Sequence, residues 1–268
     1  MAIRNESNGI RLDSQGIEEL PASLASRRDL VHLSAYDNRL PSLPDWLWSL
    51  TDLQSLNLSV NQLTMLPEAI ESLRNLRMLD VGHNRITQLP HALGLLMSLT
   101  DFLYLSDNGI EELPETLTSL TQLRYLNVTD NRLAALPADI GDMVGLVELR
   151  AYRNPLVTLP DSIGLLVNLR ELHLDQTLLN ALPSTIGNLQ SLRILSLREC
   201  RLTALPASVG SLQRLRHLDL RGNLLAELPD SLAHLPHLEK LDLRWIHQLR
   251  YLPPWIALLE ARGCLVYH

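Results

Sequence analysis

The side chains that could do nucleophilic or acid–base chemistry are scattered along this chain of 268 residues. Nucleophilic catalysis by Cys200 or Cys264 would need a base beside the thiol, and acid–base catalysis would need enclosed carboxylates with shifted pKa values. The nine histidines include His217, His234 and His237, which do not converge on one place. The sequence also has no metal-spaced Cys/His cluster and no glycine-rich phosphate loop. We therefore expect no enzyme activity, no metal site and no cofactor.

The elements that must position any site are set by leucine, which recurs every 23 residues. Each unit follows the stretch from Leu53 to Leu73, which reads Leu-x-x-Leu-x-Leu-x-x-Asn-x-Leu-x-x-Leu-Pro-x-x-Ile-x-x-Leu. The first leucines of successive units are Leu30, Leu53, Leu76, Leu99, Leu123, Leu146, Leu169, Leu192, Leu215 and Leu238, so a spacing of 23 is broken once by 24. Such a period predicts a stacked solenoid.

This pattern resembles the leucine-rich repeat family over Ile10 to Tyr267, specifically its 23-residue Leu-Pro subclass of Ras-linked intracellular scaffolds, plant cytosolic relatives, and bacterial effectors and small bacterial proteins. The Leu-Glu-Lys-Leu-Asp-Leu-Arg stretch from Leu238 and the Pro-Pro-Trp-Ile stretch favour the bacterial members. The resemblance implies an α/β-type solenoid, a right-handed curved stack with a concave parallel β-sheet. Short helices, 3-10 turns and loops would form the convex side.

Within each unit, the Leu-x-Leu stretch alternates apolar and polar residues, which predicts a short strand with one buried face. A place shortly after each strand is polar, and its amide can satisfy buried backbone groups of the turn. It holds Asn38, Asn61, Asn84, Asn108, Asn131, Asn154 and Asn223. Thr177 and Cys200 take this place in two units, so we interpret Cys200 as a structural substitute in preference to a nucleophile.

The repeat predicts one elongated domain over residues 1–268. It comprises an N-terminal partial repeat and cap at 1–29, nine repeats at 30–237, and a degenerate last repeat with a C-terminal cap at 238–268. Trp255, Ile256 and Leu259 should shield the last core layer. The one extra residue between Leu99 and Asn108 predicts a bulge in Thr100-Asp101-Phe102, before Leu103-Tyr104-Leu105 regains register. The insertion is either neutral drift or a re-aiming of Phe102 at a binding surface.

The concave surface can be read from the outward strand residues. Its middle carries an aromatic and basic group comprising Phe102, Tyr104, Tyr125, Arg150, Tyr152, Arg153 and His173. The chain has only one Phe, four Trp and six Tyr, and no core requirement explains four of them here. Tyr and Arg are enriched at interface hot spots, so this group is our candidate protein-binding site, with accidental surface aromatics as the alternative.

A secondary candidate is the basic ladder formed by Arg198, Arg221 and Arg244. These arginines lie beside Asp219 and Asp242, so mutual neutralisation on neighbouring strands and recognition of an acidic peptide both remain open. The net charge of −7 opposes a nucleic-acid partner. The sequence shows neither a secretory signal nor a membrane span.

Together these features predict a non-catalytic module that binds a protein or peptide partner through its concave face. Two cysteines without a disulfide-rich cap indicate a cytoplasmic protein, in the host cytoplasm if it is a delivered effector. We expect a monomer, with a homo-oligomer built through the convex face as an alternative. A further alternative is the recognition domain of a longer bacterial effector enzyme, such as a ubiquitin ligase, whose catalytic domain is not in this chain.

Overall fold

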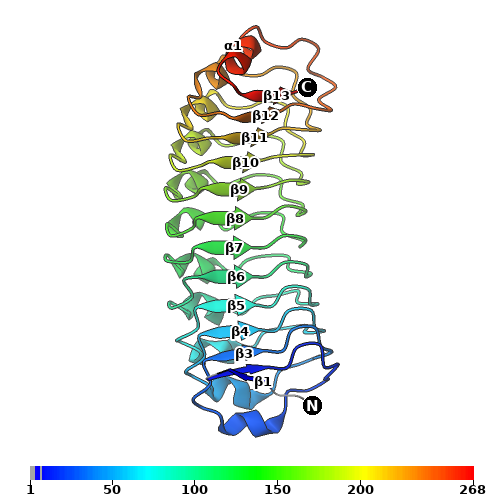
Figure 1. The fold of residues 1–268 in the computed structure, drawn as a ribbon, viewed down its shortest axis with the longest axis vertical. Coiled ribbons are helices and arrows are strands. Elements are labelled where there is room, and N and C mark those ends of the chain that lie inside the picture. Colours follow the sequence, from blue (N-terminus) through cyan, green and yellow to red (C-terminus); the bar gives the residue numbers. More distant parts are fainter. Residues whose placement is uncertain (1–3, 7) are drawn as a thin grey trace. The chain divides into compact units, whose positions relative to one another are not determined.

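The computed structural model describes residues 4–6 and 8–268. The chain divides into two compact units, Met1–Arg132 and Leu133–His268, called unit 1 and unit 2. Each unit is a stack of repeats in which a three-residue strand alternates with a short 3-10 helix (Figure 1). The α/β-type leucine-rich repeat solenoid predicted from the sequence is thereby confirmed.

Unit 1 contains a parallel ladder from β2 to β7, with β1 added antiparallel to β2. Its strands are β1 (Arg4–Glu6), β2 (Gly9–Arg11), β3 (His32–Ser34), β4 (Ser55–Asn57), β5 (Met78–Asp80), β6 (Phe102–Tyr104) and β7 (Tyr125–Asn127). Its 3-10 helices are η1 (Ala22–Ser26), η2 (Asp45–Ser49), η3 (Glu68–Ser72), η4 (His91–Leu95) and η5 (Glu115–Ser119).

Unit 2 contains a parallel ladder from β8 to β13. Its strands are β8 (Glu148–Arg150), β9 (Glu171–His173), β10 (Ile194–Ser196), β11 (His217–Asp219), β12 (Lys240–Asp242) and β13 (Leu265–Tyr267). Its helices are η6 (Ile140–Asp142), η7 (Asp161–Leu165), η8 (Ser184–Asn188), η9 (Ala207–Ser211), η10 (Asp230–His234) and the α-helix α1 (Ile256–Ala261).

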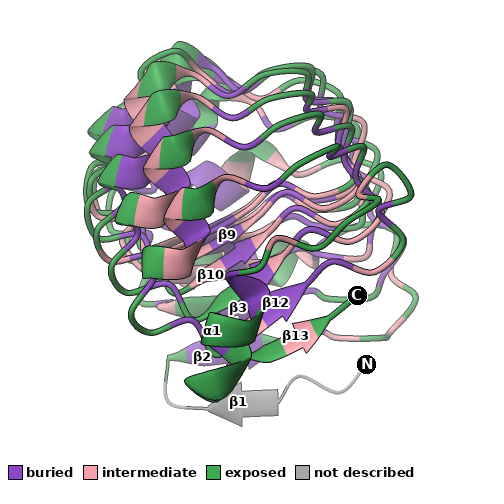
Figure 2. Ribbon diagram, turned by 90° about the horizontal axis from the view of Figure 1, so that it is seen from above, coloured by how far each residue is buried: buried purple, intermediate pink, exposed green. Residues whose placement is uncertain are grey.

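Leucine fills the core because the middle residue of each repeat strand points inward while its two neighbours point outward. Leu56, Leu103 and Leu172, for example, are fully buried or nearly so, and the flanking strand residues are partly or fully exposed. Figure 2 shows this alternation in strands such as β9 and β10, with exposed positions on the outer turns of the 3-10 helices. The outward side chains of the strands form what we call the sheet face.

The polar place after each strand behaves as predicted. The Asn131 side chain is buried; its Nδ2 donates to the carbonyl oxygens of Leu105 and Val128 at 2.9 and 3.0 Å, and its Oδ1 accepts from the Ile110 N–H at 3.0 Å. One amide therefore joins its own turn to the preceding repeat. Cys200 substitutes in the same way, with its Sγ 3.2 Å from the Leu174 carbonyl oxygen.

The 3-10 helices of neighbouring repeats pack closely, and glycine permits this. A Cβ added at Gly94 in η4 would lie 2.1 Å from the carbonyl oxygen of Thr116 in η5. Gly164 and Gly187 in unit 2 meet the next 3-10 helix in the same way, with the nearest carbonyl oxygen at 2.4 Å in each case. These positions have no room for a side chain.

The extra residue of the 24-residue repeat is accommodated at Thr100 and Asp101, within the segment where the sequence places it, and β6 keeps its register. Met78 pairs with Phe102, and Phe102 pairs with Tyr125, residue for residue. Ahead of β6, the Asp101 N–H donates to the Arg77 carbonyl oxygen at 3.0 Å, while the Thr100 carbonyl oxygen accepts from the Arg124 N–H at 3.0 Å. Two residues thus fill the place that one residue fills in a regular repeat. The insertion is absorbed there because the three-residue strand must keep its register to keep Leu103 in the core.

The C-terminal cap of unit 2 forms as predicted. Trp255, Ile256 and Leu259 are all buried, in α1 or directly before it. The Trp255 indole N–H donates to the Asp230 carboxylate at 3.0 Å. After α1 the chain adds β13 to β12 in parallel, with Val266 opposite Leu241.

Candidate functional site

Three of the predicted site residues gather in an aromatic cluster on the sheet face of unit 1. The ring centroids of Phe102 and Tyr104 lie 5.8 Å apart, those of Phe102 and Tyr125 5.6 Å, and those of Tyr104 and Tyr125 4.9 Å. The cluster forms because β6 and β7 are adjacent and parallel, and all three residues point outward. Such ring pairs contribute about 0.5–1.5 kcal/mol each beyond their buried area.

This aromatic cluster is accessible although it is packed. Phe102 is 43% exposed, while the two tyrosines are partly buried. Packed rings of this kind have few rotamers left to lose when a partner binds, which lowers the entropic cost of binding. The arrangement offers a preorganised apolar surface with two phenol groups.

Two other predicted residues, Arg150 and His173, lie in a charged cluster on the sheet face of unit 2. They face each other across β8 and β9, and the register also places Glu148 opposite Glu171. The Arg150 guanidinium donates from Nε to Glu148 Oε1, and His173 Nε2 lies 3.1 Å from Glu171 Oε2. All four side chains are partly buried.

Tyr152 and Arg153 follow β8 and contact each other. The Arg153 guanidinium lies 5.7 Å from the centroid of the Tyr152 ring, and its Nε donates to Gln176 Oε1 at 2.9 Å. The predicted middle group is therefore distributed over both units. Phe102, Tyr104 and Tyr125 form one cluster in unit 1, while Arg150, Tyr152, Arg153 and His173 belong to unit 2.

The basic ladder is largely neutralised within unit 2. Arg221 Nε donates to Asp219 Oδ1 at 2.9 Å, and Arg244 Nη2 donates to Asp242 Oδ2 at 2.7 Å. Burial of the Asp242 carboxylate opposes its ionisation, but the hydrogen bonds from Arg244 and the charge of Arg221 outweigh burial and lower its pKa. The hydrogen bonds that Arg221 and Arg244 donate to Asp219 and Asp242 raise the pKa of both guanidinium groups. The ladder pairs with its own carboxylates, as the neutralisation alternative predicts.

Sequence reasoning missed the aromatic side chains beside this ladder. Trp245 is 57% exposed, and the guanidinium groups of Arg221 and Arg244 lie 6.0 and 5.7 Å from the centroid of its ring system. Arg244 also lies 5.2 Å from the ring centroid of Tyr267 in β13. The available signal was that Trp245 directly follows a ladder arginine, Arg244.

Neither cysteine is placed for nucleophilic chemistry. Cys200 and Cys264 are both buried free thiols, and burial raises the pKa of each. Catalytic thiols have lowered pKa values and partial exposure. The environment of both cysteines is that of a structural residue.

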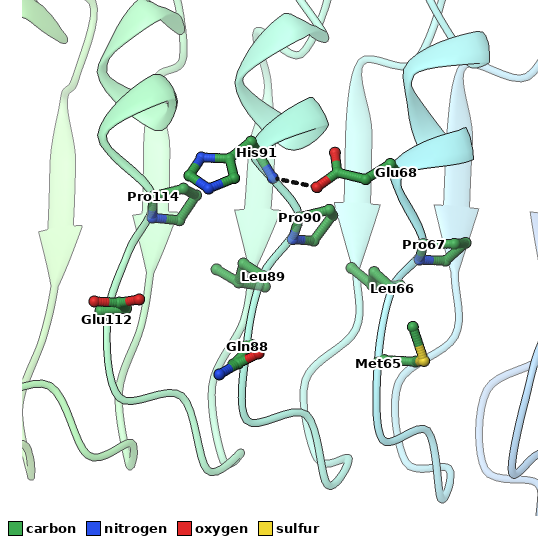
Figure 3. Close-up of a pocket in the computed structure, with 10 residues that line it drawn as sticks. All are labelled: Met65, Leu66, Pro67, Glu68, Gln88, Leu89, Pro90, His91, Glu112 and Pro114. Carbon is green, nitrogen blue, oxygen red and sulfur yellow. Dashed lines mark hydrogen bonds between the residues drawn. The ribbon is translucent and has the colours of Figure 1, made fainter.

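A pocket of about 350 Å³ lies among the loops that lead into η3, η4 and η5 (Figure 3). Pro67, Pro90 and Pro114 contribute to its lining. The Glu68 carboxylate accepts hydrogen bonds from the backbone N–H groups of His91 and Ala92 at 3.0 and 2.7 Å. Glu68 therefore provides hydrogen-bond acceptors for the backbone N–H groups in the first turn of η4. Its role here is structural.

The repeat architecture and the family comparison agree. A model described as "Leucine-rich repeat region" matches residues 63–159 and 159–246, and a second, "Leucine Rich Repeat", matches residues 52–73. The chain belongs to the leucine-rich repeat family. No curated protein matches the sequence.

Solved structures with this fold include receptors and a bacterial effector. The plant peptide hormone receptor RGFR1 in complex with RGF2 is 29% identical, with a TM-score of 0.76 over 84% of this chain and 37% of that one. The Arabidopsis receptor kinase HAESA, in complex with the peptide hormone IDA and the co-receptor SERK1, is 27% identical, with a TM-score of 0.76 over 88% and 42%. YopM, a leucine-rich effector protein from Yersinia pestis, is 26% identical, with a TM-score of 0.72 over 89% and 61%.

The matched region covers less than two thirds of each of these three proteins. None of the helices among the described residues is both long enough and apolar enough to cross a membrane.

Proposed function

We propose that this protein is a non-catalytic interaction module that binds a protein partner through the sheet face. Each unit has its own candidate contact residues: the aromatic cluster in unit 1, and Arg150, Tyr152, Arg153 and His173 in unit 2. The observation that carries the proposal is the aromatic cluster itself. Its rings pack against each other on the outside of β6 and β7, where the leucine core has no need of them.

The physical argument rests on what these side chains contribute to an interface. Tyrosine, tryptophan and arginine dominate interface hot spots, because they bury a large area and carry directional polar groups. Two of the similar receptors were solved with peptide hormones, which supports recognition of a polypeptide by this architecture. The buried thiols of Cys200 and Cys264, both free, support a cytoplasmic location.

The test is quantitative affinity capture from a native lysate, followed by measurement of the captured partner's affinity. Tyr152→Ala should weaken binding by about 2 kcal/mol or more, as truncation of a hot spot does. The combined Phe102→Ser and Tyr104→Ser variant should abolish capture. A matched control, Met65→Ser with Met97→Ser, removes two exposed apolar side chains that lie outside the strands and should bind like the wild type.

Two results would contradict the proposal. In the first, the Met65 and Met97 control loses the partner while the sheet-face variants retain it. In the second, the sheet-face variants bind normally but charge reversal at Arg198 and Arg221 prevents binding, which would move the site to the basic ladder. Melting curves of each variant check that the fold is intact.

A second candidate function is the recognition domain of a longer effector enzyme. The observation that favours it is the similarity to the Yersinia pestis effector over 89% of this chain. The full coding sequence tests it. An open reading frame without a further catalytic domain would exclude it.

A further inference from the structure

We propose that Glu148, Glu171 and His173 form a binding site for one Zn²⁺ ion on the sheet face of unit 2. Each of these residues offers one ligand atom, and the three atoms lie within 4.8 Å of one another. Two carboxylate oxygens and one imidazole nitrogen are ligands that zinc accepts. The site shares His173 with the proposed partner-binding surface, but zinc binding itself does not require the partner.

The backbone explains why the three ligands converge. Glu148 and Glu171 are paired across β8 and β9, and His173 is two residues beyond Glu171 on the same face of its strand. Ligand atoms around a tetrahedral zinc ion are about 3.4 Å apart, given bonds of about 2.0–2.1 Å. Side-chain rotation therefore suffices to close the observed separation, with the strands unmoved.

The electrostatics favour a cation. Like charges that face each other on neighbouring strands destabilise a sheet, and here two carboxylates do so in a partly buried position. The Arg150 guanidinium offsets one of them through its hydrogen bond to Glu148. A metal-bound imidazole is neutral, so in the zinc-binding state Glu171 brings a negative charge that Arg150 does not offset, and His173 brings a nitrogen donor beside it.

The ligand set also predicts which cation binds. Calcium and magnesium prefer six or more oxygen ligands, including several waters for magnesium. An imidazole nitrogen with two carboxylates instead favours zinc and similar transition-metal ions. Three protein ligands leave the fourth position of a tetrahedral ion open to water.

The ion pair between Arg150 and Glu148 gives the proposal a distinctive signature. Arg150 donates to Oε1 of the Glu148 carboxylate, so the guanidinium and zinc compete for the negative charge of the same group. Arg150→Gln removes this competitor, keeps a polar side chain and should tighten zinc binding severalfold. A site that did not use Glu148 would show no such gain.

Isothermal titration of the chelator-treated, tag-free protein with Zn²⁺ alone tests the site. We expect one zinc per chain, with at least a tenfold loss of affinity in His173→Gln and in Glu148→Gln. The control is His217→Gln on β11, which also lies near a glutamate, Glu239, but belongs to no three-ligand cluster found in the described residues. The control should bind zinc like the wild type, and Ca²⁺ should not compete.

The absorption spectrum of the Co²⁺-substituted protein gives a second readout, since it reports coordination directly. Wild-type protein should show the bands of a nitrogen- and oxygen-ligated cobalt ion, and His173→Gln should lose them. The proposal is overturned if Zn²⁺ does not bind at millimolar concentration, or if His173→Gln and His217→Gln weaken binding equally. Unchanged affinity in Arg150→Gln would also contradict the proposed competition.

Discussion

At the residue scale, the asparagine after the strand, present in most repeats, links its turn to the preceding repeat. Asn131→Leu would leave the carbonyl oxygens of Leu105 and Val128 and the Ile110 N–H without their partner. We expect the free energy of unfolding to fall by about 1–3 kcal/mol, measured by chemical denaturation. Asn57→Ser on the sheet face should cost less than about 1 kcal/mol. Equal losses in the two variants would show that the asparagine is not a structural link.

Asp80 provides a test of charge burial on the same face. Burial raises the pKa of its carboxyl group, although the Gly82 N–H donates to it at 3.0 Å. A folded-state pKa above the unfolded value means that its contribution to stability is present at low pH and is lost as pH rises through the folded pKa. Asp80→Asn should therefore melt higher than the wild type at neutral pH, and the two should converge at about pH 3.

Asp242 should respond in the opposite direction. Its folded-state pKa is lowered, so its contribution is present above the unfolded pKa and is lost as pH falls through the folded pKa. Asp242→Asn should melt below the wild type at neutral pH, because Arg244 and Arg221 lose a carboxylate partner. A pair of melting series with the same sign for both variants would refute these assignments.

At the element scale, the close packing of 3-10 helices makes glycine indispensable at defined places. Gly94→Ala would push a methyl group against the Thr116 carbonyl oxygen, which lies 2.1 Å from the new Cβ position. We expect a loss of about 1–3 kcal/mol in the free energy of unfolding, as for other overpacked sites. Gly109→Ala is the control, since its Cβ would first meet the Thr87 methyl group at 3.3 Å. A similar loss in both variants would contradict the packing argument.

The elements were predictable because their determinants are local and periodic. The leucine spacing fixes which residue of each strand is buried, so the strands, the asparagine positions and the Trp255 cap could be predicted. The spacing also located the extra residue to Thr100-Asp101-Phe102, ahead of the strand leucine Leu103. The backbone hydrogen bonds of Thr100 and Asp101 show that the extra residue lies directly before β6.

The candidate site was less predictable, because contacts between side chains depend on rotamers as well as position. The sequence placed Phe102, Tyr104 and Tyr125 on one face, and the structure adds that their rings touch. The sequence analysis singled out Arg150 and His173 as candidate site residues but did not single out Glu148 and Glu171. Glu148 and Glu171 are one 23-residue period apart, so the repeat already places them on neighbouring strands, but acidic residues are common on surfaces. Only the side-chain positions reveal that the two carboxylates converge on His173.

At the scale of the whole molecule, charge limits the partners. The chain has 30 acidic and 23 basic residues, which gives a net charge of −7. Affinity for nucleic acid that is independent of sequence comes from lysine and arginine at phosphates, and several arginines here are already paired with carboxylates. We expect duplex DNA to bind with a Kd weaker than about 10⁻⁴ M at physiological salt, measured by fluorescence anisotropy. Salt-sensitive micromolar binding would contradict this.

The single 24-residue repeat has a consequence for protein engineering. An extra residue inside β6 would turn every following side chain of the strand to the opposite face, but the bend at Asp101 keeps Phe102 paired with Met78. The segment at Thr100 and Asp101 is therefore a position where residues can be inserted without loss of strand pairing. A loop grafted between Thr100 and Asp101 would start two residues before Phe102, so designed binders built on this scaffold could gain a variable segment next to the aromatic cluster.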